Sequence, residues 1–143
     1  MVFIDTNILV YTVDPTDLNK QRQAIEELDQ LIQAGTGVLS AQILSEYFAV
    51  VTRKLSPPVS VETARQHLDA FRQLWPVVPV TAEVVIEAAR ATEIYHLNLW
   101  DAQIWAAAKL AGARELLTED LNDGETIEGV RIRNPFAHLE QKP

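Results

Sequence analysis

The sequence contains no cysteine, which excludes disulfide bonds, thiolate nucleophiles and cysteine-based zinc sites. Its three histidines, His67, His96 and His138, are scattered along the chain and do not have the spacing of metal ligands. Long hydrophobic runs are also missing, so the sequence predicts neither a signal peptide nor a membrane-spanning helix. We therefore expect a cytoplasmic protein that has no contact with a membrane and uses no thiol chemistry.

Positive charge is also scarce. The chain has 12 Lys and Arg residues against 20 Asp and Glu residues, and its formal net charge is −8. This balance argues against a broad basic surface that binds nucleic acid through its phosphates. It is compatible with a nuclease whose carboxylates surround divalent cations, because the metal then supplies the local positive charge.

The remaining composition is that of an ordinary globular protein. The 143 residues are 48% hydrophobic and 22% charged, and they contain no repeat and no low-complexity tract. A chain of this length can bury one hydrophobic core without disulfide bonds or structural metals. We expect a single domain over residues 1–143.

Short β-rich runs alternate with longer segments of helical periodicity. This alternation predicts an α/β fold, with a central, mainly parallel sheet and helices on both of its faces. Pro76 and Pro79 would confine the third strand to an edge or to its ends. We expect strands at 2–4, 37–40, 76–81, 115–120 and 130–136, and helices at 8–11, 14–34, 41–54, 61–75, 82–95 and 99–112.

Two aspartates each close a predicted strand. Asp5 follows the first strand, and Asp120 ends the strand in "ELLTED". Because ligands bind beyond the carboxyl ends of parallel strands, we expect the two carboxylates at one rim of the sheet. Each also has a local alternative, in which Asp5 caps a helix and Asp120 takes part in a turn.

Two further acids occupy helix positions beside apolar residues. Glu46 has Ile43 and Val50 one turn away on either side, and Asp101 lies in a strongly hydrophobic helix. A charge directed toward a core without a partner costs several kcal/mol, so a compensating partner is needed. The alternatives are that Glu46 is solvated, and that Asp101 follows Asn98 in a first turn where the helix dipole favours negative charge.

Convergence of the four acids would make a metal site. Mutual repulsion would raise some of their pKa values, and a divalent cation would relieve it. Ligands that are all oxygen favour a hard ion such as Mg²⁺ or Mn²⁺ over Zn²⁺. Such a site fits metal-assisted hydrolysis of a phosphodiester, a reaction that needs no protein nucleophile.

Four segments carrying these acids resemble one family, the PIN-domain ribonucleases, and within it the VapC-like toxins of toxin-antitoxin pairs. The segments are "FIDTNILVY", "LSEYFAVV", "LNLWDAQIWAAAK" and "LLTEDLNDG". Their order, approximate spacing and apolar flanks all agree with the family over nearly the whole chain. The combination is more specific than any one segment.

The resemblance implies a metal-dependent endoribonuclease with a three-layer α/β/α fold, the toxin of a toxin-antitoxin system. It makes Asp5, Glu46, Asp101 and Asp120 the acidic quartet that catalyses the reaction and binds Mg²⁺ or Mn²⁺. Asp123 is a fifth candidate ligand, because the family often has another acid at a variable offset past the fourth. The resemblance further implies that Asn7 and Thr118 orient the first and fourth aspartates, that RNA is the substrate, and that the partners are a second copy of the chain and a cognate antitoxin.

Other functions are compatible with parts of this pattern. A PIN-like module without catalytic activity could bind RNA or protein with the same fold. Phosphatases of the haloacid dehalogenase type need a second aspartate two residues after the first, where this chain has Asn7. Receiver domains need paired early acids and a late lysine at a strand end, and neither pattern is present.

We expect structural roles for the three tryptophans and for the two basic residues that follow Glu46. We expect Trp75, Trp100 and Trp105 in the core or in dimer contacts rather than stacked on bases. Arg53 and Lys54 end the helix that carries Glu46, where positive charge suits the helix dipole. Contact with an RNA backbone is the alternative for this pair.

Overall fold

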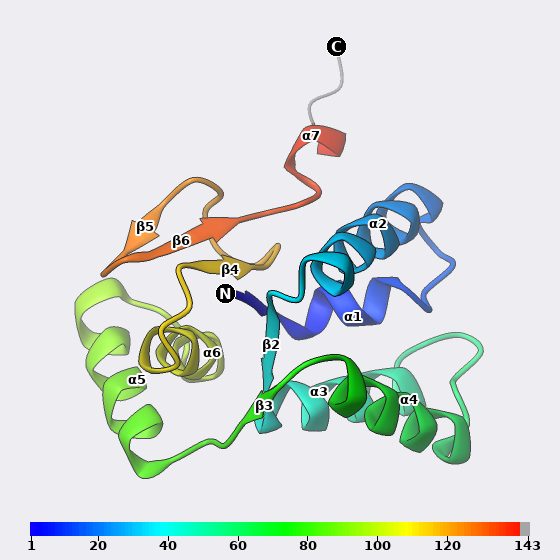
Figure 1. The fold of residues 1–143 in the computed structure, drawn as a ribbon, viewed down its shortest axis with the longest axis horizontal. Helices are drawn as coiled ribbons and strands as arrows, with labels where there is room; N and C mark the ends of the chain where they lie inside the picture. The colour runs from blue at the N-terminus through cyan, green and yellow to red at the C-terminus, as the bar shows by residue number, and fades with distance from the viewer. Residues whose placement is uncertain (141–143) are drawn as a thin grey trace.

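A mainly parallel sheet of six strands runs through the part of the chain described by the computed structural model, residues 1–140 (Figure 1). The strand order is β3-β2-β1-β4-β6-β5, and only the short β5 runs antiparallel to its neighbour. The strands are β1 (Val2–Ile4), β2 (Gly37–Ser40), β3 (Val77–Val78), β4 (Glu115–Leu117), β5 (Thr126–Ile127) and β6 (Val130–Arg133). The predicted α/β fold with a mainly parallel sheet is confirmed.

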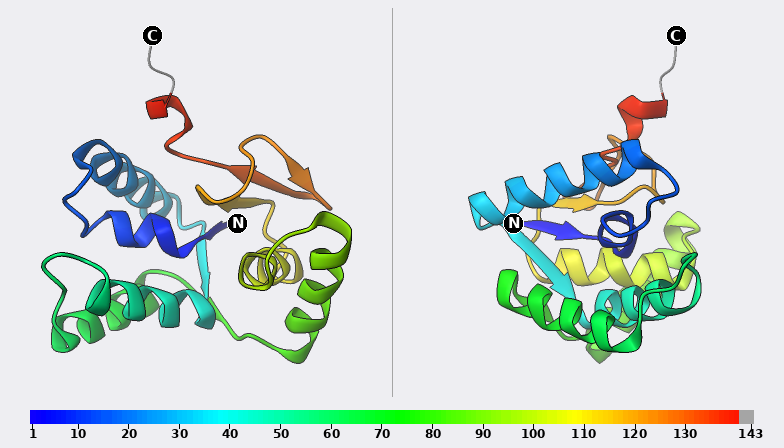
Figure 2. Two further views of the ribbon diagram at one scale, coloured as in Figure 1. Left: turned by 180° about the vertical axis from the view of Figure 1, so that it is seen from behind. Right: turned by 90° about the vertical axis from the view of Figure 1, so that its right-hand side faces the viewer.

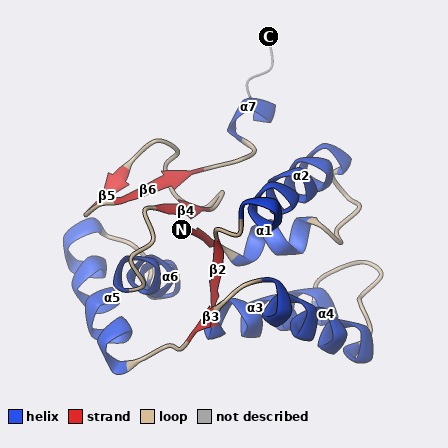
Figure 3. Cartoon of the chain, viewed as in Figure 1, coloured by secondary structure: helices blue, strands red, loops and turns tan. Residues whose placement is uncertain are grey.

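The helices form groups around this sheet (Figures 2 and 3). α5 and α6 pack against each other, and α6 contacts β4 and β6. In a second group, α3 packs against both α1 and α4. No described helix is long and apolar enough to cross a membrane. The helices are α1 (Thr6–Tyr11), α2 (Leu18–Ala34), α3 (Ala41–Arg53), α4 (Val61–Leu74), α5 (Ala82–Tyr95), α6 (Leu99–Leu110) and α7 (Ala137–Glu140).

The central strand β1 sets the position of the site. It pairs in parallel with β2 on one side and β4 on the other, and Phe3 and Ile4 are fully buried. Ile4 is in register with Leu117, so the residues after these two leave the sheet at the same edge. The backbone N–H of Asp5 donates to the Leu117 carbonyl at 3.0 Å, which brings the ends of β1 and β4 together.

The predicted start of the second helix was wrong. The Asp14-Pro15 pair forms a turn, in which the Asp14 carboxylate accepts from the Thr16 N–H and hydroxyl. Asp17 is the N-cap instead, and its carboxylate accepts from the backbone N–H groups of Asn19 and Lys20. Both aspartates suit a cap by residue type, and the periodicity of the sequence did not separate them.

Several strand boundaries also differ from prediction. The strand expected at 76–81 is reduced to β3, which lies at the sheet edge beside β2, where the flanking Pro76 and Pro79 are tolerated. β4 ends at Leu117, because the chain then turns across the sheet edge, and β6 ends at Arg133. The two-residue β5 was not predicted, because so short a segment has no period to detect.

Gly37 makes a close contact that predicts a stability effect. A Cβ at this position would lie 2.5 Å from Cδ1 of Trp75, whose side chain is buried. Gly37→Ala is expected to lower the free energy of unfolding by about 1–3 kcal/mol through overpacking. Chemical denaturation measures this, with Thr36→Ala at the neighbouring half-buried position as the control. Equal stability of the two variants would show that Trp75 moves aside without cost.

Candidate functional site

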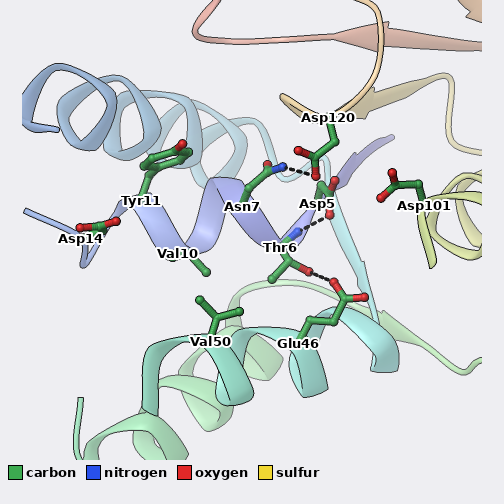
Figure 4. A pocket seen from close by; sticks show the side chains of 10 residues that line it. All are labelled: Asp5, Thr6, Asn7, Val10, Tyr11, Asp14, Glu46, Val50, Asp101 and Asp120. Carbon is green, nitrogen blue, oxygen red and sulfur yellow. Dashed lines mark hydrogen bonds between the residues drawn. The ribbon is translucent and has the colours of Figure 1, made fainter. Parts of the chain in front are cut away.

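The four predicted acids line one pocket, although they come from four different segments of the chain (Figure 4). Asp5 directly follows β1, and Asp120 lies three residues beyond β4. Glu46 projects from the middle of α3, and Asp101 from the first turn of α6. The pocket lining consists of Asp5, Thr6, Asn7, Val10, Tyr11, Asp14, Glu46, Val50, Asp101 and Asp120.

Asp5 is the most enclosed of the four acids, with 4% of its surface exposed. One carboxylate oxygen accepts from the backbone N–H of Thr6 at 2.6 Å, and the other from the Thr118 hydroxyl at 2.6 Å. The pKa of Asp5 is raised to about 7, mainly by burial; the two hydrogen bonds oppose the rise, and the nearby Asp120 and Asp101 contribute to it. Asp5 is therefore both the N-cap of α1 and a pocket acid whose charged form is disfavoured by burial.

Asp120 is connected to both of the polar residues that the resemblance singled out. The side-chain amide of Asn7 donates to its carboxylate at 2.9 Å (Figure 4), and its backbone N–H donates to the Thr118 hydroxyl at 3.1 Å. Burial raises the pKa of Asp120, and Asp101 adds to the rise. Thr118 is fully buried, so a single hydroxyl joins the ends of β1 and β4 through Asp5 and Asp120.

Glu46 is held by residues that the sequence analysis did not identify. The Thr6 hydroxyl donates to one of its oxygens at 2.9 Å, and the Gln42 side chain donates to the other at 2.7 Å. Gln42 also donates to the Trp100 carbonyl at 3.0 Å and accepts from Gln103 at 2.9 Å. Gln42 lies one helical turn before Glu46, and this spacing is the signal that could have revealed it.

Asp101 combines the two roles that the sequence left open. Asn98 caps α6 by accepting from the Asp101 backbone N–H at 2.9 Å, and its amide donates to the Asp101 carboxylate at 2.6 Å. The acid thus belongs to a capped first turn and also lines the pocket. Burial raises its pKa, the Asn98 hydrogen bond opposes the rise, and the neighbouring Glu46 adds to it.

Asp123 lies apart from the four acids. Its carboxylate accepts from the Asn134 backbone N–H at 2.8 Å, and the residue lines a different pocket together with Arg131. Its assignment as a metal ligand therefore gains no support from position and stays a prediction. Two of the tryptophans, Trp75 and Trp105, are buried as expected.

The donor set of the acidic pocket suits a hard divalent cation. Its ligands would all be carboxylate oxygens, and the buried Asn7 Oδ1 has no hydrogen-bond partner among the described residues. Like charges contribute to the raised pKa values of Asp5, Asp101 and Asp120, and a cation would relieve this repulsion. Within residues 1–140, however, no three His, Asp or Glu side chains lie close enough to hold one ion together. The carboxylates must rotate toward one another to do so.

The Thr118 hydroxyl offers a test of this hydrogen-bond network. Thr118→Val leaves a buried Asp5 oxygen and the Asp120 N–H without their partner, which costs about 1–3 kcal/mol in the free energy of unfolding. Denaturant melts at pH 8 measure the loss, and Thr118→Ser, which keeps the hydroxyl, should lose much less. If valine and serine were equally stable, the hydroxyl would not be what joins the two strand ends.

The fold matches several solved structures at low sequence identity. The chain is 21% identical to a chain of the VapBC2 complex from Rickettsia felis, with a TM-score of 0.67 over 94% of this chain and 98% of that one. It is 19% identical to a chain of DNA-bound VapBC from Salmonella typhimurium, with a TM-score of 0.67 over 94% and 97%. The sarcin-ricin loop cleaving toxin VapC20 of Mycobacterium tuberculosis matches at 18% identity, with a TM-score of 0.61 over 81% and 87%.

The sequence itself gives a more direct assignment. No curated protein sequence matches the chain significantly. The sequence profile of the PIN domain does match, over residues 2–122, a range that includes all four acids of the pocket. Since this match spans most of the 143 residues, the chain belongs to the PIN domain family.

Proposed function

We propose that this protein is an endoribonuclease that depends on Mg²⁺ or Mn²⁺. The observation that carries the proposal is the pocket itself, in which four acids from the ends of two parallel strands and from two helices face one space. Three of these acids have raised pKa values. Perturbed acids gathered in a cleft are typical of a functional site rather than of surface decoration.

The quartet would hold the divalent cation, with Asp5 and Asp120 contributed by the sheet edge and Glu46 and Asp101 by the helices. A bound cation of this kind lowers the pKa of an attacking water and offsets charge on the phosphate. In the metal-free pocket, Asn7 and Thr118 position Asp120 and Asp5 through the hydrogen bonds described above. Thr6 and Gln42 do the same for Glu46.

We further propose that the enzyme is the toxin of a toxin-antitoxin pair and acts as a homodimer. The support is the similarity to toxin-antitoxin complexes from Rickettsia felis and Salmonella typhimurium, and to a toxin that cleaves the sarcin-ricin loop. A stripe of exposed apolar residues on α2 offers a surface for a protein partner. Its members recur every seven residues and are Leu18, Ile25 and Ile32.

A PIN-like module that binds without cleaving is the second candidate. One observation favours it, namely that no three acids of the described residues lie within reach of one ion. An active enzyme would need the carboxylates to close on the cation, and Glu46, Asp101 and Asp120, which are more exposed than Asp5, can do so by rotation. A module that only binds would need no such movement.

The purified protein should cleave RNA with Mg²⁺ or Mn²⁺ and stop when a chelator removes the metal. Asp101→Asn should abolish cleavage while circular dichroism and gel filtration stay unchanged, because Asn98 can still cap α6. Asp69→Asn, at an exposed position of α4, serves as the matched control. Cleavage that survives the chelator would exclude the metal mechanism, and full activity of Asp101→Asn would exclude the site.

The toxin role needs a separate experiment in cells. Expression of the active protein should arrest growth, and co-expression of a small neighbouring gene product should relieve the arrest. Sequencing of RNA ends shortly after induction, compared with the Asp101→Asn variant, would identify the target. Normal growth despite demonstrated nuclease activity would count against the toxin role and leave the enzyme intact.

A further inference from the structure

The acidic pocket is larger than a metal site requires. Its volume is about 290 Å³, whereas one water molecule occupies about 30 Å³ in the liquid. Beyond the acids it continues between α1 and α3, where Val10 and Val50 point toward each other from the two helices (Figure 4). We call this part the valine arm, made of Val10 and Val50, with Tyr11 and Asp14 at its far end.

The valine arm is a part of the pocket that lies between two helices whose other residues pack together. α1 and α3 contact each other, and Ile8 and Leu9 on α1 and Val51 on α3 are buried in the core. Val10 and Val50 are only half-buried, so each keeps apolar surface open toward the pocket. An apolar wall of this kind accepts a flat, poorly hydrated group and rejects a charged one.

The charge of the side chains on α3 changes along the helix, from negative to apolar to positive. Glu46 lies at the acidic end, Val50 follows one turn later, and Arg53 and Lys54 follow after another turn. The step from Glu46 to Lys54 covers about 12 Å along the helix axis. Neither cation forms an ion pair within residues 1–140, and both are exposed. Along α3, an acidic, an apolar and a basic zone thus follow one another, while Asp14 adds a carboxylate at the far end of the arm.

We propose that the valine arm binds a nucleobase adjacent to the cleaved phosphodiester, and that Val10 and Val50 thereby help to select where RNA is cut. The proposal rests on the ribonuclease function proposed above. In a nucleotide strand each flat base branches from a sugar that lies between two phosphates, and this arrangement matches the order of the zones. The cleaved phosphate lies at the acids, its neighbouring base lies between the valines, and a further phosphate lies at Arg53 and Lys54.

Binding of single-stranded pentaribonucleotides tests this directly. Each oligonucleotide carries one abasic position, and all affinities are measured with Mn²⁺ in the Asp101→Asn background, which prevents turnover. At one position, loss of the base should weaken binding about tenfold. Val50→Phe fills the arm and should abolish this difference by weakening the intact oligonucleotide to the level of the abasic one. Val85→Phe, at an exposed position of α5, is the matched control and should keep the tenfold difference.

The outcomes separate the two proposals. Base dependence that is absent at every position, or that persists unchanged in a folded Val50→Phe, overturns the base site. Base dependence that Val50→Phe removes, in a protein whose wild type cleaves no RNA, supports the base site and overturns the nuclease. If Val50→Phe disturbs the fold in a thermal melt, Val50→Leu gives the same comparison with a smaller side chain. If neither Val50→Phe nor Val50→Leu changed RNA binding, but the antitoxin no longer relieved the growth arrest caused by these variants, the arm would belong to a protein partner and the proposal would be overturned.

Discussion

Asp5→Asn should lose RNA cleavage by on the order of 1,000-fold, or about 4 kcal/mol of activation free energy. The same substitution should make the metal-free protein more stable at pH 8. The activity falls because Asp5, at the end of the central strand β1, is one of the four acids proposed to hold the cation. The stability rises because a buried charge is removed from a pocket where Asp120 and Asp101 already repel it.

The sign of the stability effect follows from the direction of the pKa shift. In the folded protein the pKa of Asp5 rises from 3.8 to about 7, so the folded state keeps a proton that the unfolded chain releases. Stability is then highest below pH 4 as far as this group is concerned, and it falls as the pH rises from about 4 to about 7. Above pH 7 the full cost is present, on the order of 4 kcal/mol.

Asparagine avoids this cost and keeps most of the local contacts. Its oxygen can accept from the Thr6 N–H, and its amide can donate to the Thr118 hydroxyl, which now acts as acceptor. Denaturant unfolding of the wild type and the variant from pH 4 to pH 8, with a chelator present, measures the effect. The two curves should diverge as the pH rises. Asp29→Asn, at an exposed position of α2, should show no divergence, and parallel curves for Asp5→Asn would mean that Asp5 is not destabilised by burial.

The metal-free protein should gain stability when Mg²⁺ or Mn²⁺ is added. A ligand at 100 times its dissociation constant adds about 2.7 kcal/mol to the free energy of unfolding, because it binds the folded state only. Relief of repulsion among the four acids is the physical source of this gain. Thermal melts at pH 8 with increasing metal concentration should show a rising midpoint that saturates.

A double variant separates binding in the pocket from general salt effects. Asp5→Asn combined with Asp120→Asn removes both acids of the sheet edge and should show no saturable rise. Sodium chloride at equal ionic strength should reproduce only the part of the rise that is due to screening. Metal stabilisation of equal size in the double variant would place the ion elsewhere on this acidic chain.

Much of the fold is readable from local patterns. The apolar runs of β1 and β4 predict buried parallel strands, and the residues that end them predict the edge at which ligands bind. Pro76 and Pro79 predict an edge strand or a position at strand ends, and β3 lies at the sheet edge with the two prolines flanking it. The start of α2 could not be decided in this way, because Asp14 and Asp17 have the same capping chemistry and only the path of the chain separates them.

Some residues of the candidate site could be predicted from the sequence, and others could not. Glu46 and Asp101 stand out in the sequence because each interrupts an apolar face, and both line the pocket. Gln42 and Gln103 do not stand out, since glutamine on a helix is ordinary. Their role depends on a hydrogen bond between α3 and α6, two helices that are distant in the sequence. Polar networks that cross between elements therefore escape sequence reasoning.

By itself, the sequence determined the alternation of strands and helices, the family, and the identity of four acids at unusual positions. The alternation and the acids depend on periodicity and residue type, which act over a few neighbouring residues, whereas the family depends on motifs spread along nearly the whole chain. Only the tertiary structure decided that Asp5 is buried enough to raise its pKa, that Asp123 lies away from the quartet, and that an apolar arm adjoins the acids. Burial, repulsion and pocket shape depend on which distant segments pack together, and that information exists only once the chain has folded.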